Sequence, residues 1–338
     1  MKRKLKVGVI GLGYWGPNLV RNFYKIPEVE VVAVADLSKE RLGKIALDYP
    51  SIKILTKKAS DIFKSKEIDA VVIATPVHTH FKLTHEALAA GRHVLVEKPM
   101  TKTVPEAERL IETASKKNLI LMVDHTFVYS PPVKKIKELI ERGSLGRLHY
   151  IDSTRINLGL FQSDINVIWD LAPHDFSIIN YLVGRKPQSL AAYGIKHPAD
   201  TKEAVAYLTI KYPNNILAHV NVSWFSPVKL RTMLIGGNKR MVVYDHIHPS
   251  EKIKIYDHGV KISNNKADPF NPVYRAGDIS IPKIESGEAL AEVCKHFVES
   301  IFNKKIPLTS GVEGLDVVKL LEASDRSLES NGVEVEII

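Results

Sequence analysis

A lysine stands at the end of an apolar run that has the composition of a buried strand. Lys98 follows His93–Val96 and Glu97, and Pro99 comes directly after it. A charged residue at the carboxyl end of a central strand of an open α/β sheet points into the crevice where such sheets bind ligands. Pro99 cannot continue a strand ladder and restricts the backbone. The lysine could therefore stabilise negative charge on a substrate oxygen, although a surface lysine in a loop is the simpler alternative.

An aspartate and a histidine are spaced for proton transfer in the second half of the chain. Asp170 and His174 are four residues apart, so in a helix they share one face. A carboxylate beside an imidazole can hold one tautomer and make the ring a better base. The alternative is that Asp170 is only a helix N-cap and His174 a packing residue.

A glycine-rich turn follows the first apolar run, with Gly11, Gly13 and Gly16 in the spacing G-x-G-x-x-G. The first glycine permits a tight turn, the second lets a pyrophosphate approach the backbone, and the third allows close packing of helix on strand. Free N–H groups at the start of the next helix favour phosphate. Tyr14 and Trp15 lie inside this turn and are counted among the expected cofactor contacts.

Asp36 lies twenty residues after Gly16, at the end of the second predicted strand. There its carboxylate would accept hydrogen bonds from the adenosine ribose hydroxyls and repel a 2′-phosphate, which favours NAD over NADP. Two alternatives stay open at this position. Asp36 could merely cap the following helix, and Arg41 is near enough in sequence to permit some use of both cofactors.

The segment Thr75-Pro76-Val77-His78-Thr79-His80 follows the fourth strand. In a doubly wound sheet, strands one and four flank the switch point, so this loop should border the nicotinamide half of the cofactor. Pro76 would stiffen the loop and Thr75 could contact the cofactor. His80 is a further candidate contact, although a residue that starts a helix and has no catalytic part is the more economical interpretation.

The elements that must position these residues change in character along the chain. Up to residue 124, continuous apolar strands alternate with helical patterns, which predicts a parallel, doubly wound sheet. Longer strand-like segments then follow one another, separated by turn residues, which predicts antiparallel hairpins. We therefore expect an α/β protein with two domains, residues 1–124 and 125–338. The predicted strands are Leu5–Ile10, Val29–Ala35, Ile68–Ala74, His93–Val96, Leu119–Val123, Leu148–Ile156, Ser189–Ile195, Glu203–Lys211, Ile216–Trp224, Arg231–Ile235 and Met241–Tyr244. Helices are expected at about 286–303 and 312–330, and the segment 245–285 is expected to be a long loop or a lid.

Composition sets further bounds. A chain of 338 residues with 45% hydrophobic and 25% charged residues is typical of a soluble globular protein of two domains. A single cysteine, Cys294, excludes a disulfide framework and a cysteine metal site within one chain, and we expect no metal. The absence of a long apolar stretch and of a signal-peptide pattern leads us to expect a cytoplasmic protein that does not associate with membranes.

The net charge of +9 is concentrated in the first half, where residues 1–124 hold 21 Lys and Arg against 14 Asp and Glu. This asymmetry suits an anionic ligand, and a nucleic acid is the competing explanation. The basic residues are scattered, as at Lys57-Lys58 and Lys116-Lys117, and form no stripe with aromatic residues. We therefore expect no nucleic-acid partner. Salt-dependent DNA binding would contradict this.

Three motifs together resemble the glucose-fructose oxidoreductase/inositol dehydrogenase/MocA (Gfo/Idh/MocA) family. They are the run Gly11–Asn18, the tripeptide Glu97-Lys98-Pro99, and Asp170 with His174. The resemblance covers the whole chain. It implies an N-terminal Rossmann domain, a crossover near 124–130, and a C-terminal α/β domain with a large, mostly antiparallel sheet. In relatives the Lys-Pro bond is commonly cis, which proline makes admissible.

The resemblance also implies roles for single residues. Lys98 would contact cofactor and substrate and assist proton transfer, His174 would act as acid and base, and Asp170 would orient it or contact substrate. Glu97 would lie beside the nicotinamide ribose. His125, after the sixth strand, occupies the place where relatives contact the nicotinamide end with a polar side chain.

The first glycine-rich run and the segment Thr309–Gly314 are similar to members associated with sugar-nucleotide pathways, including UDP-N-acetylglucosamine 3-dehydrogenases. A nucleotide sugar is therefore the expected substrate, with a free-sugar or inositol dehydrogenase as the alternative within enzymes. A non-catalytic NAD-dependent sensor is the alternative outside them. Candidate contacts to sugar hydroxyls, named on loop position alone, are Tyr129, Asn157, Asp164 and Asn166. An exposed sheet face would favour a homodimer or homotetramer.

Overall fold

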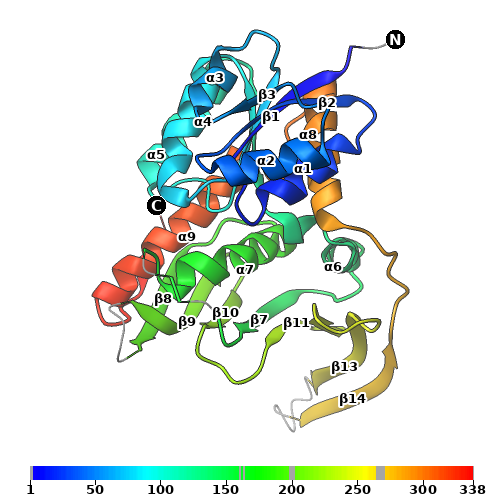
Figure 1. The fold of residues 1–338 in the computed structure, drawn as a ribbon. Coiled ribbons are helices and arrows are strands. Elements are labelled where there is room, and N and C mark those ends of the chain that lie inside the picture. The colour runs from blue at the N-terminus through cyan, green and yellow to red at the C-terminus, as the bar shows by residue number, and fades with distance from the viewer. Residues whose placement is uncertain (1–2, 160, 163, 198–201, 264–270, 338) are drawn as a thin grey trace. The chain divides into compact units, whose positions relative to one another are not determined.

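The computed structural model describes residues 3–159, 161–162, 164–197, 202–263 and 271–337 (Figure 1). The chain forms two compact units, Met1–Tyr129 with Gly287–Lys319, and Ser130–Ser286 with Leu320–Ile338. Both units are therefore built from two separate stretches of chain. The expected domain boundary after residue 124 stays a prediction.

The first unit contains a six-stranded parallel sheet in the order β3-β2-β1-β4-β5-β6. Helices lie on both faces, with α3, α4 and α5 on one and α1 and α2 on the other (Figure 1). On the side of α1, Phe23 packs edge-to-face against Phe297 of α8. The expected doubly wound parallel sheet is confirmed, and β1 and β4 are neighbours as that topology requires. The elements are β1 Leu5–Ile10, α1 Gly16–Tyr24, β2 Val29–Ala35, α2 Lys39–Asp48, β3 Ile54–Thr56, α3 Ala59–Lys64, β4 Ala70–Ile73, η1 Val77–Thr79, α4 His80–Ala89, β5 His93–Glu97, α5 Val104–Lys116, β6 Leu121–Asp124, η2 Thr126–Tyr129 and α8 Ala289–Asn303.

Local sequence explains where these elements begin. The buried strands are runs of Val, Ile, Leu and Ala because both sheet faces are covered. Ser38 caps α2 by accepting a hydrogen bond from the N–H of Arg41 (3.3 Å), and Thr103 caps α5 through the N–H of Glu106 (3.4 Å). At the edge of the sheet, Thr309 accepts a hydrogen bond from the N–H of Val123 (2.8 Å), so the chain returns to this unit beside β6.

The second unit contains a nine-stranded sheet in the order β14-β13-β12-β11-β7-β10-β9-β8-β15. Only β7 and β10 pair in parallel, which confirms the expected mostly antiparallel sheet. Helix α7 packs on β7, β9 and β10. Its strands and helices are α6 Pro131–Glu141, β7 Leu148–Ile156, α7 Val167–Val183, β8 Ser189–Lys196, β9 Glu203–Tyr212, β10 Ile216–Ser223, β11 Leu230–Gly237, β12 Met241–Asp245, β13 Ile253–Ser263, β14 Asn271–Ser280 and β15 Val335–Glu336. Helix α9, Gly311–Glu329, belongs to the first unit as far as Lys319.

The expectation of a long loop or lid over 245–285 is wrong. Its described residues form β13 and β14, a hairpin at the end of the second sheet, where Val260 pairs with Tyr274 (Figure 1). Residues 264–270 lie outside the described part of the chain. The strands were missed because charged residues and glycines, such as Asp257, Gly259, Arg275 and Gly277, interrupt their apolar residues, so no continuous apolar run marks them. No helix among the described residues has the length and apolarity needed to cross a membrane.

Candidate functional site

The glycine turn after β1 leaves room for a nucleotide phosphate. Gly11 has φ +92°, and a Cβ there would lie 2.4 Å from the carbonyl oxygen of Ala74. A Cβ on Gly16 would lie 2.0 Å from the carbonyl oxygen of Gly11. A Cβ on Gly13 would meet only the Arg41 guanidinium, at 4.0 Å. Two glycines are therefore needed for close packing and the third leaves an open approach to the backbone, at the start of α1 where free N–H groups favour phosphate. These residues fit a dinucleotide.

Asp36 follows β2, and its carboxylate is almost completely buried. One oxygen accepts a hydrogen bond from the N–H of Leu12 (2.6 Å) and the other from the N–H of Ser38 (2.7 Å). The Arg41 guanidinium lies 3.7 Å away. The cap of α2 is Ser38 and not Asp36. Asp36 thus ties the glycine turn to the end of β2, and its contact with an adenosine ribose stays a prediction. Tyr14 and Trp15 are exposed beside this turn.

His80 joins two loops at the carboxyl edge of the sheet. It is the first residue of α4, and its contact with the cofactor stays a prediction. Its ring is buried, with Nδ1 2.7 Å from the carbonyl oxygen of Pro99 and Nε2 2.7 Å from that of Thr75. Burial lowers the pKa of His80, so the neutral ring donates to only one of these carbonyls at a time. The Thr75 hydroxyl contacts that of Thr79 at 2.6 Å, and Pro76 is exposed. The loop after β4 is thereby fixed to the turn that contains Lys98.

Lys98 comes directly after β5, and its peptide bond to Pro99 is cis, as the family resemblance implies. Glu97 pairs in register with Asp124 at the end of β6, and both side chains are buried. The Thr126 hydroxyl donates a hydrogen bond to Oδ1 of Asp124 (2.6 Å). Burial raises the pKa of Glu97 well above its usual range, and the Asp124 carboxylate raises it further. Burial also raises the pKa of Asp124, and the nearby charge of Lys98 acts in the opposite direction on both carboxyl groups. The sequence did not identify Asp124, because its partner lies on a neighbouring strand.

His125 is buried next to this group, and neither ring nitrogen has a hydrogen-bond partner among the described residues. Burial and then the nearby charge of Lys98 lower its pKa to about 3, so the ring is neutral at physiological pH. Buried ring nitrogens without hydrogen-bond partners, close to Lys98, are expected in a site that binds a polar group of a cofactor. Tyr129 is also buried, and its hydroxyl lies 3.1 Å from that of Thr309. A contact from Tyr129 to a sugar stays a prediction.

In the second unit, Asp170 and His174 are both in α7, so the shared helix is confirmed. The N-cap is Asn166, which accepts hydrogen bonds from the N–H groups of Ile168 and Trp169 (3.1 Å each). Asp170 is therefore not the cap. One of its oxygens accepts a hydrogen bond from the indole N–H of Trp224 (2.8 Å). Asn166 also donates to Asp325 (3.2 Å).

A buried ion pair fixes α7 to the sheet next to His174. Arg155 of β7 donates to both oxygens of Asp175, from Nε (2.7 Å) and from Nη2 (3.1 Å), and Ser153 donates to the same carboxylate (2.9 Å). Both ionic side chains are almost completely excluded from water. The sequence analysis missed this pair because β7 and α7 are joined only by the fold. A charged residue within the alternating pattern of β7 was the one signal that could have indicated it.

The remaining predicted residues lie at the margin of this unit. Asn157 follows β7 and lines a cavity of about 310 Å³ together with Leu158, Pro227, Val228, Lys229 and Arg231. Asp164 is exposed in the segment before α7. Their contacts to substrate stay predictions.

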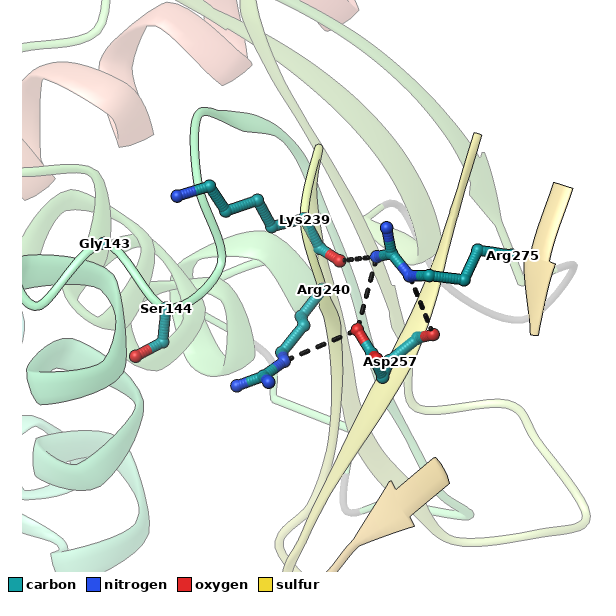
Figure 2. Close-up of a pocket in the computed structure, with 6 residues that line it drawn as sticks. All are labelled: Gly143, Ser144, Lys239, Arg240, Asp257 and Arg275. Carbon is teal, nitrogen blue, oxygen red and sulfur yellow. Dashed lines mark hydrogen bonds and ion pairs between the residues drawn. The ribbon is translucent and has the colours of Figure 1, made fainter. Parts of the chain in front are cut away.

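A second cavity, of about 410 Å³, contains none of the predicted site residues. It is lined by Gly143, Ser144, Lys239, Arg240, Asp257 and Arg275 (Figure 2). Asp257 of β13 reaches both arginines here, with its Oδ1 3.6 Å from Arg240 and 3.3 Å from Arg275. Each guanidinium therefore has a carboxylate partner.

Two family models match the chain, and together they cover most of it. The model "Oxidoreductase family, NAD-binding Rossmann fold" of the Gfo/Idh/MocA group matches residues 5–125. The model for the Gfo/Idh/MocA C-terminal domain matches residues 133–243. The first match agrees with a dinucleotide at the glycine turn.

Relatives of known name match over nearly their full lengths. The chain is 27% identical to the UDP-N-acetylglucosamine 3-dehydrogenase of Acidithiobacillus ferrooxidans, over 93% of this chain and 94% of that protein. It is 23% identical to the myo-inositol 2-dehydrogenase of Thermotoga maritima, over 96% of each. The solved structure of the Acidithiobacillus enzyme superposes with a TM-score of 0.80, covering 97% of this chain and 99% of that one at 25% identity. The scyllo-inositol dehydrogenase of Lactobacillus casei has the same fold, with a TM-score of 0.80 at 19% identity and 99% coverage of each chain. The chain belongs to the Gfo/Idh/MocA family of oxidoreductases, whose N-terminal domain is an NAD-binding Rossmann fold.

Proposed function

We propose that the protein oxidises a secondary hydroxyl group of a sugar reversibly, and that the sugar is a nucleotide sugar such as UDP-N-acetylglucosamine or its uronate, oxidised at C3. As a family member the chain is an NAD-binding oxidoreductase, and its named relatives are dehydrogenases of sugar or inositol hydroxyls. The nucleotide-sugar assignment is supported by the full-length similarity to a UDP-N-acetylglucosamine 3-dehydrogenase and by the net charge of +9. Oxidation of a free sugar or an inositol is the second candidate, and the inositol relatives favour it.

The observation that carries the proposal is the lysine on the turn after β5. In the proposed reaction, His174, oriented by Asp170, accepts the proton of the substrate hydroxyl. Lys98 donates a hydrogen bond to the alkoxide that develops, where its positive charge favours the transition state over the neutral alcohol. When bound, NAD supplies the hydride acceptor at C4 of the nicotinamide. A non-catalytic sensor would need neither Lys98 nor His174.

We further propose that NAD is preferred over NADP. Asp36 lies at the end of β2, where the ribose of a dinucleotide bound to the glycine turn would be expected. Each carboxylate oxygen of Asp36 has a second lone pair that could accept a hydrogen bond from a ribose hydroxyl. The negative charge of Asp36 would repel a 2′-phosphate. Arg41, at 3.7 Å from Asp36, is the residue that could moderate this preference.

We also propose that the protein is a homo-oligomer that associates through the second sheet. Leu217, Tyr150, Tyr207 and Leu234 are exposed on four strands of this sheet, and Leu217 pairs in register with Tyr150. Clustered apolar side chains on one sheet face are typical of an interface between subunits.

The test is a panel of UDP-sugars, free sugars and inositols, assayed with NAD for NADH formation at 340 nm. We expect turnover with a UDP-sugar, and added 2-oxoglutarate would test whether bound NADH is reoxidised in place. Lys98→Ala should lower turnover by about 10²–10³-fold while NAD affinity is nearly unchanged. Lys102→Ala, an exposed lysine on the same segment, is the matched control. Near-normal turnover in Lys98→Ala, or activity with inositols alone, would refute the proposal.

A further inference from the structure

Arg231 is a partly buried cation on the helix-covered face of the second sheet. It is the second residue of β11, directly opposite Arg155 of β7 in the register. Directly opposed side chains point to the same face of a sheet, and Arg155 meets Asp175 of α7. Two arginines therefore lie side by side on the face that α7 covers.

The carboxylate of Asp175 already accepts hydrogen bonds at both of its oxygens. Asp175 accepts hydrogen bonds from Nε and Nη2 of Arg155 and from Ser153. The Nε of Arg231 is buried and has no hydrogen-bond partner among the described residues. Burial, and then the charge of Arg155, lower the pKa of Arg231, and the carboxylates of Asp175 and Asp170 offset part of this effect. By contrast, Arg240 and Arg275 both reach Asp257 (Figure 2).

Burying the Nε–H of Arg231 without a partner, next to a second guanidinium, is unfavourable, because a buried donor without a partner costs free energy. A ligand that brings a negative charge would remove the cost. Guanidinium groups bind carboxylate and phosphate oxygens in a forked geometry, which makes an oxyanion the ligand of best fit.

Arg231 opens into the 310 Å³ cavity that Asn157 and Lys229 also line. Lys229 adds a second positive charge, and the described residues that line the cavity include no carboxylate. The residues that line this cavity are connected to α7 by hydrogen bonds. Asn157 donates its N–H to Ser223 (3.0 Å), and the next residue, Trp224, donates its indole N–H to Asp170. The cavity and the proposed proton-transfer residues thus belong to one connected piece of the second unit.

We infer that Arg231, assisted by Lys229, binds an oxyanion carried by the sugar substrate, a carboxylate or a phosphate. The inference rests on the proposed function and narrows its substrate class: the enzyme selects an anionic sugar over a neutral polyol. Arg231 is a specificity-determining residue, and it acts equally on bound substrate and on the transition state.

The test compares Arg231→Met and Arg231→Lys with Arg185→Met. Arg185 is an exposed arginine just after α7, so its replacement removes one charge from the same unit. The NAD-loaded enzyme is titrated calorimetrically with UDP-N-acetylglucosamine, its uronate and myo-inositol, and kcat and KM are measured for every probe that turns over. We expect Arg231→Met to weaken binding of the anionic probes roughly 10- to 100-fold, to raise KM with little change in kcat, and to leave myo-inositol unaffected. Arg231→Lys should weaken the binding of the anionic probes less than Arg231→Met does.

The probes separate the two anionic sources. Equal losses for both UDP-sugars would assign the contact to phosphate, and a loss confined to the uronate would assign it to the carboxylate. Thermal unfolding of Arg231→Met should be unchanged or shifted upward, because a buried donor without a partner has been removed. Equal weakening of all three probes, a loss no larger than that of Arg185→Met, or a marked fall in stability would overturn the inference. Absence of turnover with every sugar, while oxyanion binding still depends on Arg231, would instead refute the proposed reaction.

Discussion

The ion pair between Arg155 and Asp175 allows a quantitative prediction of stability. The two side chains are only 5% and 2% exposed, and they share two hydrogen bonds. Removing one member of a buried pair leaves the other charged and desolvated, which costs about 3–5 kcal/mol. Asp175→Leu should reach the upper end of this range because it leaves Arg155 facing Arg231 without a carboxylate. For a unit of this size, we expect a fall in melting temperature of roughly 6–20 °C for each single variant.

The double variant Arg155→Met/Asp175→Leu should recover most of this loss, because a buried ion pair replaced by apolar groups of similar volume is often neutral in stability. Urea unfolding of the four proteins gives the coupling free energy, which we expect to be about 3 kcal/mol or more. The pair Glu112 and Lys116 is the control. Its atoms approach to 2.6 Å, yet both side chains are well exposed, so its coupling free energy should be much smaller than that of the buried pair. Additive losses at Arg155 and Asp175, or equal couplings in the two cycles, would refute the reasoning from burial.

Three further predictions concern the cofactor site, pH and assembly. Asp36→Ala should weaken NAD binding selectively in fluorescence titrations, and an unchanged ratio of NAD to NADP affinity would contradict the assigned role. Because the pKa of His125 is about 3 in the folded protein, the unfolded chain binds a proton there between pH 6.5 and 3 while the folded protein does not, and stability falls as pH is lowered. Between pH 7 and pH 5 the wild type should therefore lose about 2 kcal/mol of unfolding free energy that His125→Asn retains. Leu217→Glu should dissociate the proposed oligomer in sedimentation experiments without loss of fold, and an unaltered sedimentation coefficient would refute the assignment of that sheet face.

Buried strands were predictable from the sequence because they consist of continuous apolar runs or of alternating apolar and polar residues. The ends of β1, β2 and β7 match the predicted ranges at both termini. The strand β3 was not predicted because it has only three residues. The hairpin of β13 and β14 was not predicted because charged residues and glycines interrupt its apolar residues.

The candidate site was predictable where its residues are adjacent in sequence, as in the glycine turn and the tripeptide around Lys98. It was not predictable where a partner comes from another element. The pairing of Glu97 with Asp124 depends on the register between β5 and β6, and the position of Arg231 opposite Arg155 depends on that between β11 and β7. Sequence spacing alone contains no information on either register.

The two units are each assembled from distant stretches of chain, and this has a consequence for synthesis on the ribosome. The segment Thr309–Ser310 pairs with β6, and β15 pairs with β8 close to the end of the chain. A nascent chain that ends at residue 286 therefore has neither unit complete, although most of both sheets has emerged. The edge of β6 stays open until the segment around Thr309 arrives, and such an edge is prone to pair with other chains. Premature termination should yield aggregates rather than a free NAD-binding fragment.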